Sequence, residues 1–306
     1  MAKLKKDDNS KVENRFEIIF LYDVEEGNPN GDPLNENRPR IDEQTGENIV
    51  TDVRLKRTVR DYLDSKGENI FIKASENENG TLLSREEMVE KALDSDIGDS
   101  TKSEIRDELL DQYLDVRLFG ATISVEDHSF ALTGPVQFKI GRSLHEVDTR
   151  YTQQSVTIPS EKGKEQGTFA DRYDLPYSLI SFYGIVNENA ADYTNLKRED
   201  VYKLADGLWN GTKSLITHSK MAHKPQALIM VEYSEDNYHI GGLDHLIEWS
   251  SEKEDTAIRK FSDIDIDYSG LEEKLQEKSD KIKTVYVNSE DMIKLDGVEI
   301  KNLDLE

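Results

Sequence analysis

Residues Arg15–Val24 read RFEIIFLYDV, an apolar run with β-branched and aromatic side chains that stops at the polar residues Glu25 and Glu26. A run of this length and composition predicts a central strand that is buried on both faces. The GNPNGDPLNENRPR that follows is too rich in Gly, Asn, Asp and Pro to continue a strand or to start a helix, so it predicts a loop. Beyond the loop, TDVRLKRTVRDYLDSK at Thr51–Lys66 has apolar residues at helical spacing and predicts a helix that returns to the strand.

Further along the chain, hydrophobic periodicity predicts the remaining elements of a sheet with helices. They are strands at Phe130–Ile140 and Leu175–Glu188, a helix at Arg198–Ile216 and a strand at Ala227–Tyr233. The order strand, helix, strand, strand, helix, strand is the split βαβ pattern of a ferredoxin-like or RNA-recognition-motif sheet. We therefore predict an α+β fold in which residues 15–233 form an RNA-recognition-like palm.

Three segments lie outside that pattern. Residues 67–115 predict an acidic helical insertion, with helices at Ser84–Leu93 and Lys102–Leu114. Residues 143–172 contain few apolar positions and predict an irregular segment that protrudes as a hairpin or flap. Residues 234–306 are predicted to form an acidic C-terminal extension.

The composition excludes several kinds of site. The 306 residues include no Cys, which excludes disulfides, thiolate zinc sites and cysteine nucleophiles and fits a reducing cytoplasm. No stretch approaches the ~18 apolar residues of a membrane span, and no apolar segment follows the basic start MAKLKKDDNSKVEN, so we expect a cytoplasmic protein with no membrane partner. The sequence contains no Gly-rich phosphate loop, GxSxG elbow or dinucleotide fingerprint, and we predict no cofactor.

The net charge of −24 argues at first against a nucleic-acid partner, because Lys and Arg supply the affinity for phosphates. The negative charge is unevenly distributed, however. Residues 231–306 carry 21 acidic and 9 basic residues, whereas residues 116–230 carry 13 of each. Acidic runs are usually solvated faces, so neither acidic block indicates a partner by itself.

The helix predicted at Thr51–Lys66 carries the most informative charges. Lys56, Arg57 and Arg60 are expected to project away from its apolar stripe, because successive residues turn by about 100°. One interpretation is a face that grips phosphates, and the other is an ordinary solvated face with ion pairs such as Arg57 with Asp61. If the face is exposed, replacing all three cations with Ala should leave the fold intact.

Two motifs could suggest a metal site, but neither supports one. Asn28, Asn30 and Asp32 alternate in the Asn-rich loop, yet no acidic ligand follows at the spacing of an EF-hand. His218 and His223 are five residues apart, whereas a helical zinc pair is four apart. We predict no metal site, and carboxylates are too abundant for any one pair to indicate acid/base catalysis.

A series of short motifs follows one order along residues 15–233. The motifs are NPNGDP at Asn28–Pro33, VTDVRLKRTVRDYL at Val50–Leu63, DVRLFGA at Asp115–Ala121, GPVQ at Gly134–Gln137, GRS at Gly141–Ser143, LPYSLISFYGIVNENAA at Leu175–Ala191, LWNGTKS at Leu208–Ser214 and SKMAHKPQALIMVEY at Ser219–Tyr233. Together they resemble the backbone subunit of the CRISPR-associated Cascade complex, which is the seventh Cas family, in its type I-B and I-C branch.

The resemblance implies an RNA-recognition-like palm with a helical insertion and a thumb-like hairpin that separates short runs of bases. Many copies of such a chain would stack along one CRISPR RNA, together with other Cascade subunits, and hold this guide for pairing with target DNA. Each copy would need only a narrow basic groove, so acidic outer faces could discourage indiscriminate binding.

The resemblance also assigns candidate contacts with the guide RNA. The cations that would line the path of its phosphates are Lys56, Arg57 and Arg60. The residues that would flank this path are Arg40, Asn28 and Asn30. The thumb would include Arg117, Arg142 and the stretch Gln153–Arg172, and a second basic edge would consist of Lys213, His218, Ser219 and Lys220.

Two other functions compete with a non-catalytic RNA-binding subunit. Related backbone proteins of type III complexes cut RNA, so a metal-dependent RNA endonuclease is the main alternative, against which the type I resemblance stands. An unrelated acidic enzyme would require the order of the motifs to be chance.

Overall fold

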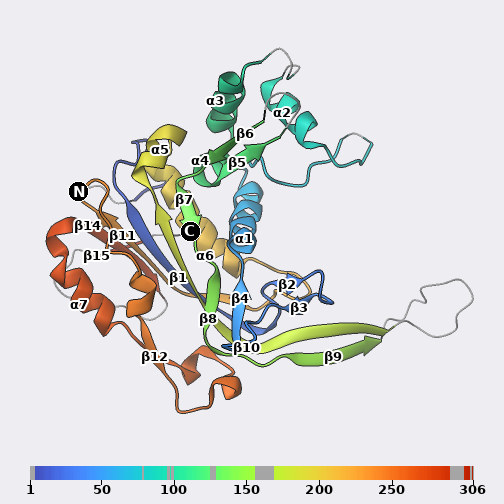
Figure 1. The fold of residues 1–306 in the computed structure, drawn as a ribbon, viewed down its shortest axis with the longest axis vertical. Coiled ribbons are helices and arrows are strands. Elements are labelled where there is room, and N and C mark those ends of the chain that lie inside the picture. The colour runs from blue at the N-terminus through green and yellow to red at the C-terminus, as the bar shows by residue number, and fades with distance from the viewer. Residues whose placement is uncertain are drawn as a thin grey trace, which may run out of the picture.

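The computed structural model describes residues 4–77, 79–94, 97, 100–124, 129–155, 169–289, 300–303 and 305. The strands of its main sheet are β1 (Phe16–Gly27), β4 (Glu47–Val50), β7 (Val136–Phe138), β8 (Gly141–Glu146), β9 (Arg150–Ser155), β10 (Phe169–Val186), β11 (His223–Tyr233), β14 (Ile282–Ser289) and β15 (Ile300–Asn302). Within the described residues this sheet has nine strands in the order β15-β14-β11-β1-β10-β8-β4, with β7 and β9 also paired to β10 (Figure 1). The predicted α+β class is confirmed.

Strand β1 lies at the centre of the sheet and is paired along both of its edges. It runs antiparallel to β10 and to β11, so that Phe20 lies opposite Phe182 on one side and Leu228 on the other. Its side chains alternate between two cores: Phe16, Ile18, Phe20, Tyr22 and Val24 enter one, and Ile19 and Leu21 enter the other. The strand predicted from RFEIIFLYDV is confirmed, and its lack of polar alternation follows from the burial of both faces.

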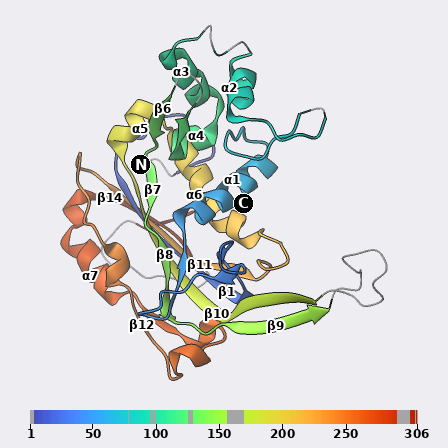
Figure 2. The same ribbon diagram turned by 45° about the vertical axis from the view of Figure 1, so that its right-hand side comes forward.

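Helices cover both faces of the sheet (Figures 1 and 2). Helix α1 (Asp52–Ser65) and helix α6 (Arg198–Lys213) pack together on the face of the first core. They approach closely at Gly207 of α6, where a Cβ atom would lie 2.8 Å from Val59 of α1. Helix α7 (Ser269–Glu277) buries Leu271 and Leu275 in the second core on the opposite face.

The helical insertion forms a small unit with its own core (Figure 1). It contains α2 (Arg85–Leu93), α3 (Lys102–Gln112), α4 (Leu114–Phe119) and a two-stranded sheet of β5 (Gly120–Ile123) and β6 (Phe130–Thr133). The helices predicted at residues 84–93 and 102–114 are confirmed. The single strand predicted at residues 130–140 is wrong, because β6 pairs with β5 whereas β7 pairs with β10. The break falls at Gly134, where a Cβ atom would lie 2.3 Å from the backbone nitrogen of Gly120.

A hairpin projects from the sheet beyond its edge (Figure 1). Its arms are β9 and the first residues of β10, which pair from Arg150 with Asp174 to Ser155 with Phe169. The expected protrusion is confirmed for these arms, and the expected irregular structure is wrong for them. The rest of the predicted segment, residues 156–168, lies outside the described residues.

The C-terminal segment adds strands to the main sheet and a helix that packs on one of its faces. Besides α7 it contains β12 (Glu248–Ser250), β13 (Asp265–Asp267), β14 and β15. Strand β14 pairs antiparallel with β11, and β15 pairs parallel with β14. In the described part of the chain, no helix combines the length and the apolar character needed to cross a membrane.

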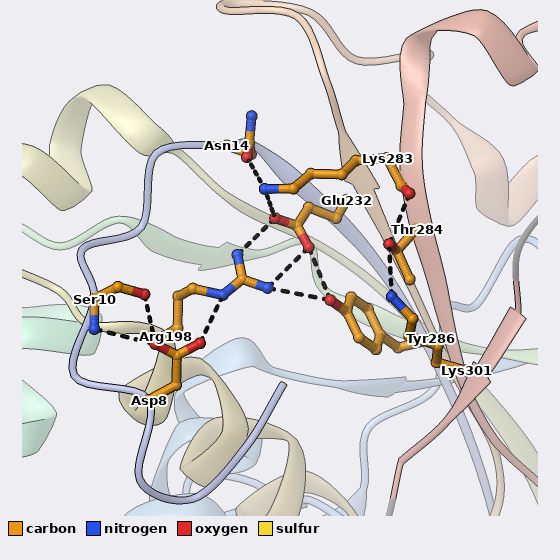
Figure 3. Close-up of polar contacts among 9 residues, drawn as sticks. All are labelled: Asp8, Ser10, Asn14, Arg198, Glu232, Lys283, Thr284, Tyr286 and Lys301. Carbon is orange, nitrogen blue, oxygen red and sulfur yellow. Dashed lines mark hydrogen bonds and ion pairs between the residues drawn. The ribbon is translucent and has the colours of Figure 1, made fainter. Parts of the chain in front are cut away.

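A buried ion-pair network fastens the N-terminal segment, α6, β11 and β14 to one another (Figure 3). Arg198 of α6 donates hydrogen bonds of 2.6 and 3.0 Å to the fully buried Glu232, and one of 3.1 Å to the hydroxyl of Tyr286. Lys283 lies 3.0 Å from the same carboxylate, and Asp8 lies 3.2 Å from Arg198. Burial alone would raise the pKa of Glu232, but the hydrogen bonds and the charge of Arg198 outweigh burial and lower it.

A second buried carboxyl, Asp23 of β1, makes the stability of the protein depend on pH. It accepts a hydrogen bond of 3.1 Å from the hydroxyl of Tyr177, and burial raises its pKa from 3.8 to about 6. A carboxyl with a raised pKa in the folded state contributes stability while it is protonated, and this contribution is lost as the pH rises through about 6. The loss amounts to roughly 3 kcal/mol, at 1.36 kcal/mol for each unit of pKa.

We predict that Asp23→Asn raises the free energy of unfolding at pH 7.5 but has little effect at pH 4. The amide keeps an acceptor for Tyr177 and needs no proton. Urea unfolding of the two proteins at both pH values measures the difference, with Asp7→Asn on the exposed N-terminal segment as the control. A stability difference that is the same at both pH values would contradict the prediction.

Candidate nucleic-acid interface

The Asn-rich loop closes into a short hairpin instead of remaining irregular. Strand β2 (Gly31–Asp32) pairs with β3 (Arg38–Pro39). Gly is favoured at position 31, because a Cβ atom there would lie 2.8 Å from the backbone carbonyl oxygen of Asn37. Asn28 is buried beneath this hairpin and donates a hydrogen bond of 2.7 Å to the carbonyl of Asn37. The loop is therefore shaped by its own side chains.

Two of the predicted residues tie this loop to the first turn of α1. The side-chain oxygen of Asn30 accepts hydrogen bonds of 2.9 Å from both the backbone N–H and the hydroxyl of Thr51, the N-cap of α1. Arg40 donates a hydrogen bond of 3.2 Å to Asp32. Its Nε is buried and has no hydrogen-bond partner among the described residues.

A cleft of about 780 Å³ separates the loop from the root of the β9–β10 hairpin, and we call it the hairpin cleft. Its lining includes the cations Arg38 and Arg40, the rings of Tyr151 and Tyr173, and Ile140. Ile140 and Tyr151 are 54% and 52% exposed, so both side chains are accessible from the cleft. Cations combined with accessible rings are the groups with which proteins bind single-stranded nucleic acid.

A second group of cations follows α6, and we call the segment 213–223 the cationic loop. It carries Lys213, His218 and Lys220, three of the residues predicted as a second basic edge. Ser219, the fourth, accepts a hydrogen bond of 2.8 Å through its carbonyl from the backbone N–H of Asn28. The cationic loop is thereby fixed to the Asn-rich loop.

Arg54 of α1 lies close enough to the cationic loop to affect its protonation. Burial and the charge of Arg54 together lower the pKa of Lys220. Arg54 donates a hydrogen bond of 3.0 Å to the hydroxyl of Thr58. Neither Arg54 nor Lys220 forms an ion pair with any described residue. Two half-buried cations that form no ion pair, in a chain with a net charge of −24, favour an anionic ligand such as a phosphate.

The two histidines of this region differ in their surroundings. His218 is exposed, whereas His223 is buried, and burial followed by the charges of Lys220 and Arg54 lowers its pKa to about 3. His223 is therefore neutral at physiological pH. Within the described ranges, no three His, Asp or Glu side chains are grouped so that they could hold a metal ion.

The expectation that Lys56 and Arg60 project from α1 is wrong. Both are only 9% exposed, because the helical insertion covers this side of the helix. Lys56 donates hydrogen bonds to Asp52 at 3.0 Å and to Gln137 at 3.2 Å. Arg60 donates one of 2.8 Å to the fully buried Asp115. A contact of Lys56 or Arg60 with RNA remains a prediction.

Only Arg57 of the three helix cations is exposed. Its Nε donates a hydrogen bond of 2.6 Å to Asp61, so the ion pair expected for a solvated helix face is confirmed. The two side chains together carry no net charge. A contact of Arg57 with RNA also remains a prediction.

The other predicted arginines are all paired with carboxylates. Arg117 lies on α4, at the end of the molecule opposite the hairpin, and binds both oxygens of Asp200 at 3.0 and 3.1 Å (Figures 1 and 2). Its expected place in the hairpin is therefore wrong. Arg142 of β8 contacts Asp42 at 2.9 Å and Glu47 at 3.0 Å.

Arg172 belongs to the first part of β10, within the hairpin. It donates hydrogen bonds to Asp174 at 2.5 Å and to the carbonyl of Glu26 at 3.3 Å. Arg172 thus joins the hairpin to the end of β1, next to the Asn-rich loop.

Sequence reasoning missed three residues of this interface: Arg54, Tyr151 and Tyr173. Arg54 could have been found, because it lies three residues before Arg57 and so on the same side of the helix. The two tyrosines gave no such signal. They face each other only because β9 and β10 pair in one register.

Comparison of the chain with known proteins shows its family. The sequence profile described as CRISPR-associated protein Cas7 matches residues 14–269. A CRISPR-associated protein Cas7 of Haloferax volcanii is 36% identical over an alignment 308 residues long, which covers 92% of this chain and 89% of that protein. The chain belongs to the Cas7 family. The resemblance to that family is thereby confirmed, and the Cas7 match continues past Tyr233, where the short motifs end.

Solved structures share the Cas7 fold of this chain. One is a chain of a CRISPR RNA-guided surveillance complex, with a TM-score of 0.55 and 14% identity, covering 94% of both chains. Another is a chain of such a complex before nicking, with the same TM-score and identity, covering 95% of this chain and 97% of the other.

We predict that Arg60→Ala destabilises this Cas7 protein by about 3–5 kcal/mol, because it leaves the buried carboxylate of Asp115 without its cation. Arg57→Ala removes the same charge from the exposed side of α1 and should change the free energy of unfolding by less than about 1 kcal/mol. Denaturant unfolding of both variants measures the difference. Equal stability of the two would show that the Arg60–Asp115 pair does not hold the insertion on α1.

Proposed function

We propose that this Cas7 protein is a guide-RNA-binding backbone subunit of a CRISPR RNA-guided surveillance complex. The observation that carries the proposal is the convergence of the Asn-rich loop, the first turn of α1, the hairpin root and the cationic loop at the end of the sheet where β1 ends and β11 begins. Arg54, Lys213 and Lys220 supply positive charge for guide phosphates there. The hairpin cleft supplies accessible rings beside them.

We propose in addition that the core of the fold is an RNA-recognition-like palm. The strands β11-β1-β10-β8 are neighbours, each antiparallel to the next. In chain order they are β1, β8, β10 and β11, with α1 between β1 and β8 and α6 between β10 and β11. This order is that of a ferredoxin-like sheet. The β9–β10 hairpin would then be the thumb, and residues 234–306 an extension that adds β14 to the edge of the palm.

The partners follow from this role. The guide would pair with target DNA, and the protein would contact further copies of itself and other Cascade subunits. Contacts with phosphates carry no sequence information, so the same subunit can hold any guide. The many carboxylates elsewhere on the chain would repel other nucleic acids, which explains how a net charge of −24 suits an RNA-binding protein. We propose a non-catalytic role.

The first test is to purify the protein after co-expression with a CRISPR transcript. We expect bound RNA of discrete length, visible in the absorbance ratio and on a denaturing gel. Protein that remains free of RNA under these conditions would refute the proposed function.

The second test concerns the phosphate contacts. We predict that Arg54→Ala, Lys213→Ala and Lys220→Ala together lower the slope of log affinity against log salt by about 2, at roughly 0.7 for each contact on a single strand. The matched control replaces the exposed Lys91, Lys102 and Lys260, which removes the same charge at a distance from the cationic loop. Identical slopes for the two triple variants would show that the cationic loop does not bind phosphates.

A further inference from the structure

Two tyrosines at the root of the hairpin face each other across its strands. Tyr151 of β9 is directly opposite Tyr173 of β10, and their ring centres are 5.3 Å apart with the rings tilted by 41°. Both line the hairpin cleft, and Tyr151 is 52% exposed. An accessible ring therefore stands beside a cleft whose volume lies within the roughly 300–1,000 Å³ of small-ligand sites.

Polar contacts hold both rings in place. The hydroxyl of Tyr151 donates a hydrogen bond of 2.8 Å to Asp171, and that of Tyr173 donates one of 3.2 Å to Glu36. The guanidinium of Arg38 covers the ring of Tyr173 at 4.4 Å, and it also donates hydrogen bonds to the Tyr173 hydroxyl at 3.1 Å and to Glu36 at 2.6 Å. The rings are thus positioned before any ligand binds, which reduces the entropy lost on binding.

The charges of the cleft select the kind of group that can enter it. Its lining includes the carboxylates of Asp32 and Glu43, and Asp171 and Glu36 hold the hydroxyls of the rings. These four carboxylates outnumber the cleft cations Arg38 and Arg40, which are paired with Glu36 and Asp32, so the cleft disfavours a phosphate, in contrast to the cationic loop. A neutral planar group meets no such repulsion and gains by stacking.

We propose that Tyr151, Tyr173 and Arg38 form a stacking platform for one unpaired base of single-stranded RNA at the root of the hairpin. This proposal rests on the proposed function. In it, a base binds in the hairpin cleft and phosphates bind at the cationic loop. Stacking uses the π face that every base presents, so the platform accepts any of the four bases. The cations of the cleft are fixed by carboxylates, which leaves few free donors to read a base edge.

A cross-strand tyrosine pair can also serve only to stabilise a hairpin, so the test must separate this role from base binding. Affinities of the full-length protein are measured for a single-stranded uridine oligomer and for a fully abasic ribose-phosphate oligomer of the same length. We expect Tyr151→Ala to weaken binding of the uridine oligomer by about 5- to 150-fold and to leave binding of the abasic oligomer unchanged. Tyr151→Phe keeps the ring and should bind both oligomers nearly as the wild type does.

The remaining outcomes each count against the platform. An equal loss for both oligomers would mean that Tyr151 only supports the hairpin, and no loss for either would mean that no base stacks on it. Failure of the wild-type protein to bind either oligomer would instead refute the proposed function. The salt slope of Tyr151→Ala should match that of the wild type, because no phosphate contact is removed.

Discussion

The fold depends on the burial of strand β1 from Phe16 to Val24. The edges of this strand are paired with β10 and β11 and its faces are covered by the two cores, so every side chain from Phe16 to Val24 is buried. Two loops start from this strand or from its neighbour: the Asn-rich loop continues β1, and the cationic loop leads into β11. The rigidity of β1 therefore places the two loops side by side.

Internal charge pairing explains how an acidic chain can keep a basic surface. Arg60, Arg117 and Arg198 are paired with the buried carboxylates of Asp115, Asp200 and Glu232, and these ion pairs hold elements of the fold together. Arg54 and Lys220 have no such partner among the described residues. The net charge thus says little about function. The positions of the unpaired cations are more informative, because they gather where the cationic loop meets α1.

The proposed function divides the interface by chemistry. The cationic loop offers cations that form no ion pair with any carboxylate in the described part of the chain, and the hairpin cleft offers fixed rings among carboxylates. A single strand of RNA has two matching components, a charged backbone and uncharged bases. Separate sites for the two components allow tight binding without selecting a sequence, which a subunit that serves many guides requires.

The sequence alone determined the order of the main elements, because apolar periodicity reports which segments are buried, and the order of its motifs determined the family. The resemblance carried by those motifs also proposed Asn28, Asn30, Arg40 and residues of the cationic loop as contacts with RNA. Only the tertiary structure decided which cations are free. Helical spacing places Lys56 and Arg60 away from the apolar stripe, but it cannot show that a segment more than fifty residues away supplies Asp115 and covers them. The sequence likewise cannot show that Tyr151 lies opposite Tyr173, because strand register is a property of the pairing and not of either strand.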